Sequence, residues 1–408
     1  ALSTNCTAYL PTNLTQPYDA LLSEHEWAGR RVHIGVAGEY MLAPRAYDPS
    51  EVPVSAAQIY GQRESAFGML QGAPAGTTLH QLGNKVRGMH DGERGQFEVT
   101  GGFEAYMATI ELQTHLKWLQ LPGDTSLSIK VPFFSMRFKD IAFTNLTKNE
   151  TLADQLFSRY VVQDQASLES FALAHGNLDL QGYGHQGIGD VCAMVHWRKR
   201  FIQQQQRLRQ VVVCARAGVS IPTGYDRDLS KAFDVSFGHD GAFAFPLGAG
   251  LQLTLSDTFR VGIDVGALFA MRRTRDWRLK TSWTQSEHLL LQTGRATREY
   301  GPEWVFSVYT QLVSPFEGAA LSIGYQFFKH TESILYPQDA LFSDATINTS
   351  QTVDVSEAHT LFAEATYNPR PRANLRVLPE LTVYAKVPVN GRAMLSGYLV
   401  GGRISWRF

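Results

Sequence analysis

The sequence predicts an all-β fold, a transmembrane antiparallel up-and-down β-barrel of about twelve strands, within a range of about ten to fourteen. Two features carry this prediction. Apolar and polar residues alternate over segments about twice as long as the roughly 5 to 6 residues of an average soluble strand. The connections between these segments are short and long in turn. No segment approaches the roughly 18 uncharged apolar residues of a membrane-spanning helix.

The segment 243–255 shows the clearest alternation, because apolar residues at its odd positions alternate with small or polar ones such as Gly248 and Gln252. After a short turn the pattern resumes over 260–271. Each segment matches the roughly 9 to 11 residues that a tilted strand needs to cross a bilayer. One face of such a strand meets lipid and the other lines the lumen.

The remaining expected strands have the same character. They span residues 30–42, 103–119, 126–140, 188–202, 211–219, 301–313, 321–327, 357–368, 379–389 and 395–408. Connections after expected strands 2, 4, 6, 8 and 10 are mostly short, and connections after expected strands 1, 3, 5, 7 and 9 are long. This asymmetry is typical of periplasmic turns and extracellular loops, and an even strand number places both chain ends in the periplasm.

The end of the chain carries an alternation of its own. Val400, Ile404, Trp406 and Phe408 share one face, and Arg403, Ser405 and Arg407 share the other. A terminal aromatic residue of this kind is common in chains that close an outer-membrane barrel, so we expect the last strand to pair with the first. The aromatic residues expected at the periplasmic girdle are Trp118, Trp197, Trp406 and Phe408.

Composition limits the partners and cofactors. The formal net charge is −1 and no basic cluster with interleaved aromatic residues occurs, so we expect no nucleic-acid partner. The three cysteines form no CxxC motif, and we expect no metal, no cofactor and no catalytic residue. The expected partners are membrane lipid, lipopolysaccharide and a small solute. A start at Ala1 without Met favours a mature form whose signal peptide has been removed.

Two segments interrupt the barrel pattern. Residues 1–25 are polar and contain two prolines, which suggests a plug or periplasmic segment ahead of a barrel at 26–408. Residues 151–175 carry apolar residues at helical spacing. We expect this insertion to form a helical extracellular loop. The loop either packs on the rim of the barrel or serves as a gate or lid for a ligand.

The residues expected to face the lumen are the candidates for function. A patch of His196, Arg198, Arg200 and Arg216 is predicted on two neighbouring strands, and Glu111 and Arg403 are further constriction candidates. Other inward residues include His33, Glu39, His115, Lys117, Arg260, Asp264 and Lys386. Charges in a lumen set ion selectivity. The alternative is that paired charges fill a narrow interior for stability.

Cys192 and Cys214 are expected to face inward on the same two paired strands. If the turn is centred near residues 203–206, they lie close to register. One hypothesis is a cross-strand disulfide in the oxidising periplasm, although directly paired strand positions fit disulfide geometry poorly, and two free thiols are the alternative.

Two short motifs lie at the same end of these strands. Gly187-Ile188-Gly189-Asp190 opens the first strand, which also carries Trp197, and Ile221-Pro222-Thr223-Gly224 ends the second. This order resembles FadL-like outer-membrane channels, in particular the branch described as phenol-degradation meta-pathway transporters. The resemblance spans residues 184–408. It implies a monomeric barrel that admits hydrophobic small molecules past an N-terminal plug, although FadL itself has fourteen strands.

The leading expectation is therefore an outer-membrane channel for passive uptake of small solutes, hydrophobic ones included. The first alternative is a structural or surface-exposed barrel with a closed lumen, whose loops bind a partner. An outer-membrane enzyme is the second alternative. Ser236, His239 and Asp240 lie together in one loop, but adjacency in sequence does not make a triad.

Overall fold

The barrel closes through strand β1 (Val32–Tyr47), which pairs with β4 (Gln96–His115) on one edge and with β18 (Met394–Arg407) on the other. The computed structural model describes residues 32–86, 95–117, 122–147, 164–313, 318–368 and 379–408. Within these ranges twelve antiparallel strands form the closed barrel. Closure pairs every strand edge, so no row of backbone amides is left unsatisfied in the wall.

The other barrel strands each pair with the next in chain order, as predicted. They are β5 (Asp124–Asn145), β7 (Val191–Gln205), β8 (Leu208–Ile221), β9 (Ala244–Thr254), β10 (Phe259–Ala270), β13 (Glu303–Val313), β14 (Ala319–His330), β16 (Ser356–Tyr367) and β17 (Pro379–Arg392). The predicted strand count and the predicted all-β barrel are confirmed. The first three predicted strands differ most from the structure, because β1, β4 and β5 extend well beyond the periodic segments.

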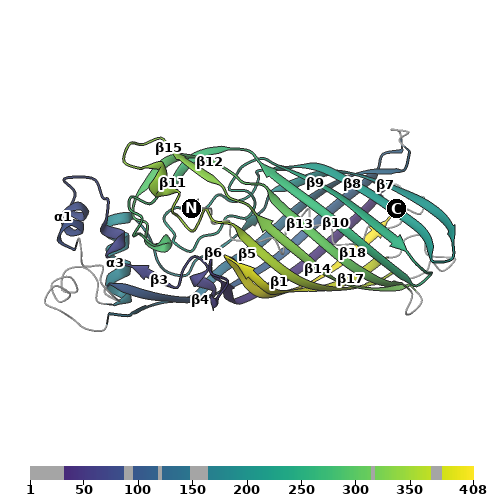
Figure 1. The fold of residues 1–408 in the computed structure, drawn as a ribbon, viewed down its shortest axis with the longest axis horizontal. Coiled ribbons are helices and arrows are strands. Elements are labelled where there is room, and N and C mark those ends of the chain that lie inside the picture. The colour runs from purple at the N-terminus through teal and green to yellow at the C-terminus, as the bar shows by residue number, and fades with distance from the viewer. Residues whose placement is uncertain (1–31, 87–94, 118–121, 148–163, 314–317, 369–378) are drawn as a thin grey trace.

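The two ends of the barrel differ in their connections (Figure 1). Short connections join β7 to β8 and β9 to β10 at the end where the C-terminus lies. The long segments after β1, β5, β8, β10 and β14 gather at the other end, here called the long-loop end. β17 and β18 are also joined at that end, through the single residue Ala393 in a left-handed conformation with φ 46°.

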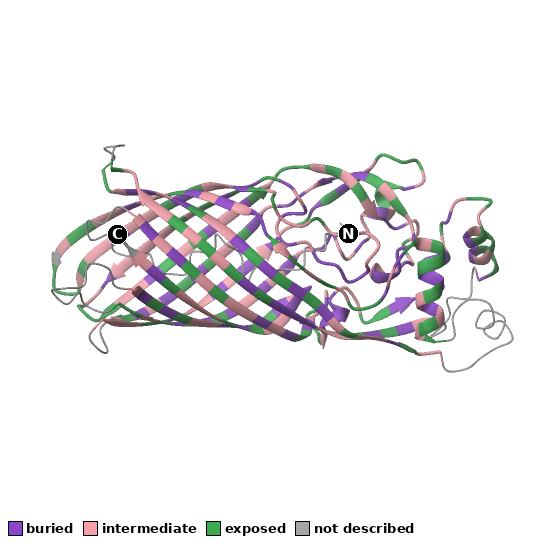
Figure 2. Cartoon of the chain, turned by 180° about the vertical axis from the view of Figure 1, so that it is seen from behind, coloured by how far each residue is buried: buried purple, intermediate pink, exposed green. Residues whose placement is uncertain are grey.

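Along the wall, apolar residues face outward and polar residues inward. Val383 is 62% exposed, whereas its neighbour Thr382 is 3% exposed. Figure 2 shows this alternation of exposed and buried residues along the barrel strands. The outer surface is therefore a continuous apolar band, far larger than the exposed apolar patches of soluble monomers.

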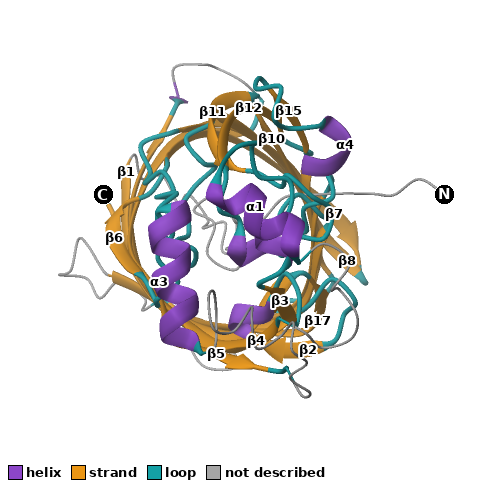
Figure 3. Cartoon of the chain, turned by 90° about the vertical axis from the view of Figure 1, so that its left-hand side faces the viewer, coloured by secondary structure: helices purple, strands orange, loops and turns teal. Residues whose placement is uncertain are grey.

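The long-loop end carries a layer of smaller elements, seen end-on in Figure 3. These are β2 (Pro53–Ser55), η2 (Ala56–Gln58), β3 (Arg63–Ser65), η3 (Gly68–Leu70), α1 (Thr78–Lys85), α3 (Gln165–Gly176), β6 (Gly184–Ile188), η5 (Glu287–Leu289) and α4 (Asp344–Ile347). A separate sheet of three strands is formed by β11 (Arg273–Arg278), β12 (Thr293–Glu299) and β15 (Ile334–Pro337).

The main hydrophobic core joins this layer to the barrel. Phe134 on β5 stacks on Phe237 from the loop after β8, with ring centroids 4.6 Å apart. Phe138 on β5 meets Phe233 from the same loop at 5.7 Å. Inward residues of β4 and β5 are apolar only near the long-loop end, so the core covers the mouth of the barrel and leaves the other half polar.

Helix α3 overlaps the second half of the insertion predicted at 151–175 and ends one residue beyond it. Its first turn is capped by Asp164, whose side chain accepts a hydrogen bond from the Ser167 amide, and its end is capped by Asn177 in the left-handed conformation. Residues 151–163, with the predicted helical spacing, and the predicted plug at 1–25 lie outside the described residues. In the described part of the chain no helix is both long and apolar enough to span a membrane.

Candidate functional site

The inner wall in the half away from the long loops is a belt of polar side chains, here called the lumen belt. It is built from alternate residues of every barrel strand, because side chains alternate between the two faces of a strand. The lumen belt comprises Glu39, Glu111, Ser128, Lys130, His196, Arg198, Arg216, Gln252, Asp264, Tyr309, Gln326, Glu364, Lys386 and Arg403.

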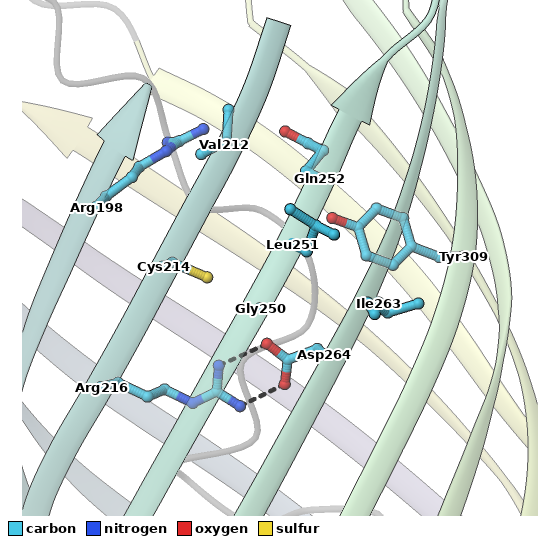
Figure 4. Close-up of a pocket in the computed structure, with 10 residues that line it drawn as sticks. All are labelled: Arg198, Val212, Cys214, Arg216, Gly250, Leu251, Gln252, Ile263, Asp264 and Tyr309. Atoms are coloured by element: carbon cyan, nitrogen blue, oxygen red, sulfur yellow. Dashed lines mark hydrogen bonds and ion pairs between the residues drawn. The ribbon is translucent and has the colours of Figure 1, made fainter. Parts of the chain in front are cut away.

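A recess opens in this belt between β7, β8, β9, β10 and β13 (Figure 4). Its volume is about 420 Å³, including space open to solvent. Arg198, Arg216, Gln252, Asp264 and Tyr309 supply its polar groups. β7 and β8, the two strands that carry the predicted patch, therefore form one side of a site that extends to β9, β10 and β13.

Arg216 and Asp264 form the central contact of the recess. Arg216 Nη1 donates to Asp264 Oδ2 at 2.7 Å, and Nη2 donates to Oδ1. Two parallel N–H···O bonds of this kind fix the orientation of both groups. The ion pair reaches from β8 across β9 to β10, so it ties three strands together inside the wall.

Glycines on the intervening strand leave room for this pair. Gly248 pairs directly with Arg216 on β8, and a Cβ at Gly248 would lie 2.5 Å from Arg216 Nε. A Cβ at Gly250 would lie 2.7 Å from Cys214 Sγ and 2.9 Å from Asp264 Oδ2. Gly250 therefore lines the recess, and Gly248 lies beside it against the Arg216 side chain.

The predicted patch is assembled as expected on β7 and β8. His196 pairs directly with Arg216, and Arg198 pairs with Cys214, while Arg200 lies two residues further toward the short turn. Directly paired residues of neighbouring strands share a face. Each even-numbered residue of β7 from Cys192 to Ile202 pairs with an even-numbered residue of β8, so the inward face carries even numbers on both strands. His196 Nε2 also meets Ser128 Oγ at 2.8 Å.

The other two lumen candidates lie elsewhere in the belt. Glu111 on β4 pairs with Lys130 on β5, with Oε1 and Nζ 3.8 Å apart, so it joins the patch through β5. Arg403 on β18 lies two strands from Glu111, because β1 pairs with both β18 and β4. There it acts electrostatically on Glu364 of β16. Five of the six candidates therefore belong to the lumen belt, and Arg200 lies two residues from Arg198 toward the short turn.

The structure describes three of the four aromatic residues expected at the girdle, and their contacts differ. Trp118 lies outside the described residues. Trp197 donates its indole N–H to the Pro122 carbonyl at 3.0 Å, in the connection between β4 and β5. Trp406 pairs with Ile34, and Phe408 exchanges two backbone hydrogen bonds with Val32, so the chain end pairs with the first strand.

The predicted disulfide between Cys192 and Cys214 is wrong. Cys192 pairs with Ser220 and Cys214 pairs with Arg198, because the β7–β8 register differs from the one assumed for a turn at 203–206. Cys214 therefore lies six residues from the partner of Cys192 along β8. Six residues of strand span about 20 Å, far beyond the roughly 7 Å that a disulfide allows between Cα atoms.

The two glycine-containing motifs meet at the long-loop end of β7 and β8. Asp190 accepts hydrogen bonds from the amides of Gly224 and His239, each at 2.9 Å, and from His239 Nδ1 at 3.1 Å. Thr223 Oγ1 donates to the Gly189 carbonyl at 2.8 Å. This clasp of Gly189, Asp190, Thr223, Gly224 and His239 fixes where β7 begins and where the chain leaves β8.

Sequence reasoning did not single out several residues of the recess. Of the residues that line the recess, Tyr309 packs directly over Gly262, its partner on β10. Outside the recess, Lys130 and Ser128 contact Glu111 and His196 of the lumen belt from β5. The inward glycines were the available signal, since a glycine in a strand marks a close approach of another group. Among the described residues no group of three or more His, Cys, Asp or Glu side chains is placed to hold a metal ion.

A solved outer membrane channel from Pseudomonas putida F1 has a similar structure, with a TM-score of 0.53 and 13% sequence identity over 95% of this chain and 98% of that chain. The chain has the fold of that channel. No protein-family profile and no curated protein matches the sequence.

Two further solved structures match weakly. The toluene transporter TbuX of Ralstonia pickettii matches over 93% of this chain and 90% of that chain, with 9% identity and a TM-score of 0.32. The monoaromatic hydrocarbon channel CymD matches over 100% of this chain and 94% of that chain, with 10% identity and a TM-score of 0.29. Neither similarity is close enough to carry a structural argument.

Proposed function

We propose that the chain is an outer-membrane channel for passive uptake of small amphipathic solutes. The observation that carries the proposal is the lumen belt, a ring of polar and charged side chains on the inner wall of a closed barrel whose outer wall is apolar. An apolar outer band suits lipid, and a polar inner wall suits water and solutes. The similar Pseudomonas putida protein is itself an outer membrane channel.

The same geometry supports an orientation in the membrane. The long-loop end faces the outside, where lipopolysaccharide surrounds the loops, and the short-turn end faces the periplasm. Trp197, Trp406 and Phe408 then lie at the periplasmic side of the bilayer, where aromatic side chains are enriched. Hydrophobic solutes remain part of the proposal, because apolar residues line the long-loop end of the interior.

Conductance in planar bilayers tests the channel. The wild-type barrel is expected to give discrete openings, and Gly248→Val, which fills the recess beside Arg216, should lower the single-channel conductance by roughly half. Leu247→Val is the matched control, since Leu247 is the adjacent outward residue and is 45% exposed. Heat-modifiable gel migration verifies that both variants fold. Equal conductance of all three proteins contradicts the role of the recess.

A second candidate is a closed barrel whose loops bind a partner. It is favoured by the hydrophobic core over the mouth, where Phe134 and Phe138 of the wall pack against Phe233 and Phe237 of a loop. A folded wild-type barrel that stays silent at all applied voltages contradicts the channel and supports this alternative.

We propose no catalytic role for the loop residues Ser236, His239 and Asp240. His239 Nδ1 faces Asp190 at 3.1 Å, and Asp240 pairs with Arg298, so the arrangement does not support a triad. Lipase and protease assays of the folded barrel are expected to show no turnover.

A further inference from the structure

A cluster of polar side chains lies on the outer wall of the barrel, on the neighbouring strands β1, β4 and β5. Its centre is Glu104 on β4, which pairs directly with Arg137 on β5. Residues two apart on a strand share a face. Tyr106 of β4 is 51% exposed, whereas the intervening Ala105 is buried in the core. Glu104 therefore faces outward, in a wall whose exposed residues are mainly apolar.

Glu104 is only 4% exposed, because four side chains donate hydrogen bonds to its carboxylate. Arg137 donates from Nε and Nη2 to Oε2 at 3.0 and 2.7 Å, and Lys139 Nζ donates to the same oxygen at 3.2 Å. The hydroxyls of Tyr106 and Tyr40 donate to Oε1 at 2.8 and 3.3 Å. An unpaired carboxylate on a lipid-facing wall is costly. Paired in this way, Glu104 holds two cations at set positions.

The two cations of the cluster remain accessible from outside the barrel. The Arg137 side chain is 57% exposed and that of Lys139 is 38% exposed. Two positive charges are opposed by one carboxylate, so the cluster has an excess of positive charge. The described hydrogen bonds of Arg137 use Nε and Nη2 and leave Nη1. Arg137 Nη1 and the Lys139 ammonium can therefore donate to an anion that approaches from the membrane.

Tyrosine rings border the cluster on the side toward the short-turn end. Tyr40 pairs directly with Tyr106, and their ring centroids are 4.9 Å apart. Tyr398 on β18 is 45% exposed and pairs with Leu42 of β1, which extends this aromatic surface. Tyrosine is enriched where acyl chains meet polar headgroups, because its ring is apolar and its hydroxyl is polar. The cluster therefore has the character of a membrane interface.

The position of the cluster along the strands identifies this interface. Glu104 pairs with Leu42, ten residues along β1 from Val32. Val32 in turn exchanges backbone hydrogen bonds with Phe408 at the chain end. Ten residues of strand span about 33 Å, and a tilt of about 40° reduces this to about 25 Å of height, which matches the apolar band of an outer-membrane barrel. With the long-loop end on the outside, the cluster lies at the outer leaflet.

We propose that the cluster binds a phosphate group of lipopolysaccharide, the phosphorylated glycolipid of the outer leaflet. Arg137 Nη1 and Lys139 Nζ donate to the phosphate oxygens, and Glu104 keeps both cations in place. The Tyr106 ring packs against an acyl chain. Arginine and lysine bind phosphate through charge-assisted hydrogen bonds, which are weakly screened where they are partly buried. The inference rests on the proposed membrane location and orientation, and it needs no conduction.

Native mass spectrometry of the full chain in detergent tests the site with lipid A, the phosphorylated anchor of lipopolysaccharide. Wild type is expected to retain lipid A, and to retain roughly tenfold less of the same lipid without its phosphates. The double variant Arg137→Gln/Lys139→Gln should lower lipid A retention roughly tenfold. Lys199→Gln is the matched control and should leave retention unchanged. Lys199 lies on the outward face of β7 near the short-turn end, over the exposed ring of Phe201.

A second double variant separates the arginine from the charge of the cluster. Arg137→Gln/Lys139→Gln leaves the Glu104 carboxylate without its cations, whereas Glu104→Gln/Arg137→Gln removes one charge of each sign and keeps Lys139. The excess of positive charge is then preserved, but the positioned guanidinium is lost. Retention of lipid A should still fall several-fold, on the order of fivefold. Heat-modifiable gel migration verifies that each variant folds.

Absence of lipid A retention by the folded wild type, equal retention of the dephosphorylated lipid, or equal retention by either double variant overturns the proposal. Equal retention of phosphatidylglycerol also overturns it, in favour of a general attraction for anionic lipid. Conductance of the same preparations keeps the lipid site separate from the channel. A conducting wild type that retains no lipid A contradicts the lipid site alone, and a silent barrel that retains lipid A contradicts the channel alone.

Discussion

The Asp190 carboxylate accepts a hydrogen bond from the Gly224 amide at 2.9 Å, although the two residues are 34 positions apart. Asp190 precedes β7 and Gly224 follows β8, so the bond joins the two strands of one hairpin at their long-loop end. The same carboxylate accepts from the His239 amide, just before β9. One buried acid therefore fixes three chain segments at the rim of the barrel.

Replacing Asp190 by Ala is expected to lower the free energy of unfolding by about 2–4 kcal/mol, because buried donors of Gly224 and His239 lose their acceptor. Guanidinium titration followed by gel migration measures the change. Asp276→Ala is the control, since Asp276 is exposed on the small sheet of the loop layer. An equal effect of the two substitutions would show that the clasp is not stabilising.

Replacing Asp264 by Asn should shift the selectivity of the channel toward anions. The substitution removes one negative charge from the lumen belt and leaves Arg216 without its bidentate partner. The ratio of chloride to potassium permeability is expected to rise on the order of twofold, measured as the reversal potential under a KCl gradient. Asp257→Asn, at the short turn after β9, is the control, and a matching shift there would refute the assignment.

Deleting Phe408 should destabilise closure of the barrel. Its backbone N–H donates to the Val32 carbonyl at 2.9 Å, and its carbonyl accepts from the Val32 amide at 3.3 Å. Loss of both bonds is expected to cost roughly 2 kcal/mol, seen as a lower midpoint for heat-induced gel shift. Phe408→Leu keeps the backbone bonds and should have less than half this effect. A larger effect of the Leu variant would assign the stability to the ring instead.

Acid should weaken the loop layer through Asp240. Burial favours the neutral acid, but Arg298, Arg275 and Arg227 outweigh it and hold the pKa of Asp240 below its usual range. A carboxyl with a depressed folded-state pKa contributes stability above its unfolded pKa of about 3.9 and loses it as the pH falls through the lower folded value.

Asp240→Asn should therefore reduce the fall in unfolding free energy as the pH drops below about 4, measured by acid titration of the unfolding midpoint. Asp240 has a positive φ of 49°, which asparagine tolerates well. The exposed Asp344→Asn is the matched control. If both variants keep the wild-type slope, Asp240 is not the group that responds to acid.

The strand pattern was predictable because burial on one face of a strand leaves a period of two in the sequence. It placed Arg198 and Arg216 on the inner wall and Phe408 beside the first strand. The register of a hairpin was not predictable to the residue, since short turns of different length suit the same alternation. That is why Cys192 and Cys214 were expected to be close and are not.

The sequence by itself determined the closed barrel, its twelve strands and the facing of the wall residues on its most regular strands, because these follow from local alternation and from the lengths of connections. Only the tertiary structure decided which inward charges meet. Arg216 and Asp264 are 48 residues apart and on strands that are not neighbours. Their contact depends on register and on the space above Gly248 and Gly250, and the cluster around Glu104 likewise depends on the register of β1, β4 and β5, which no periodic pattern records.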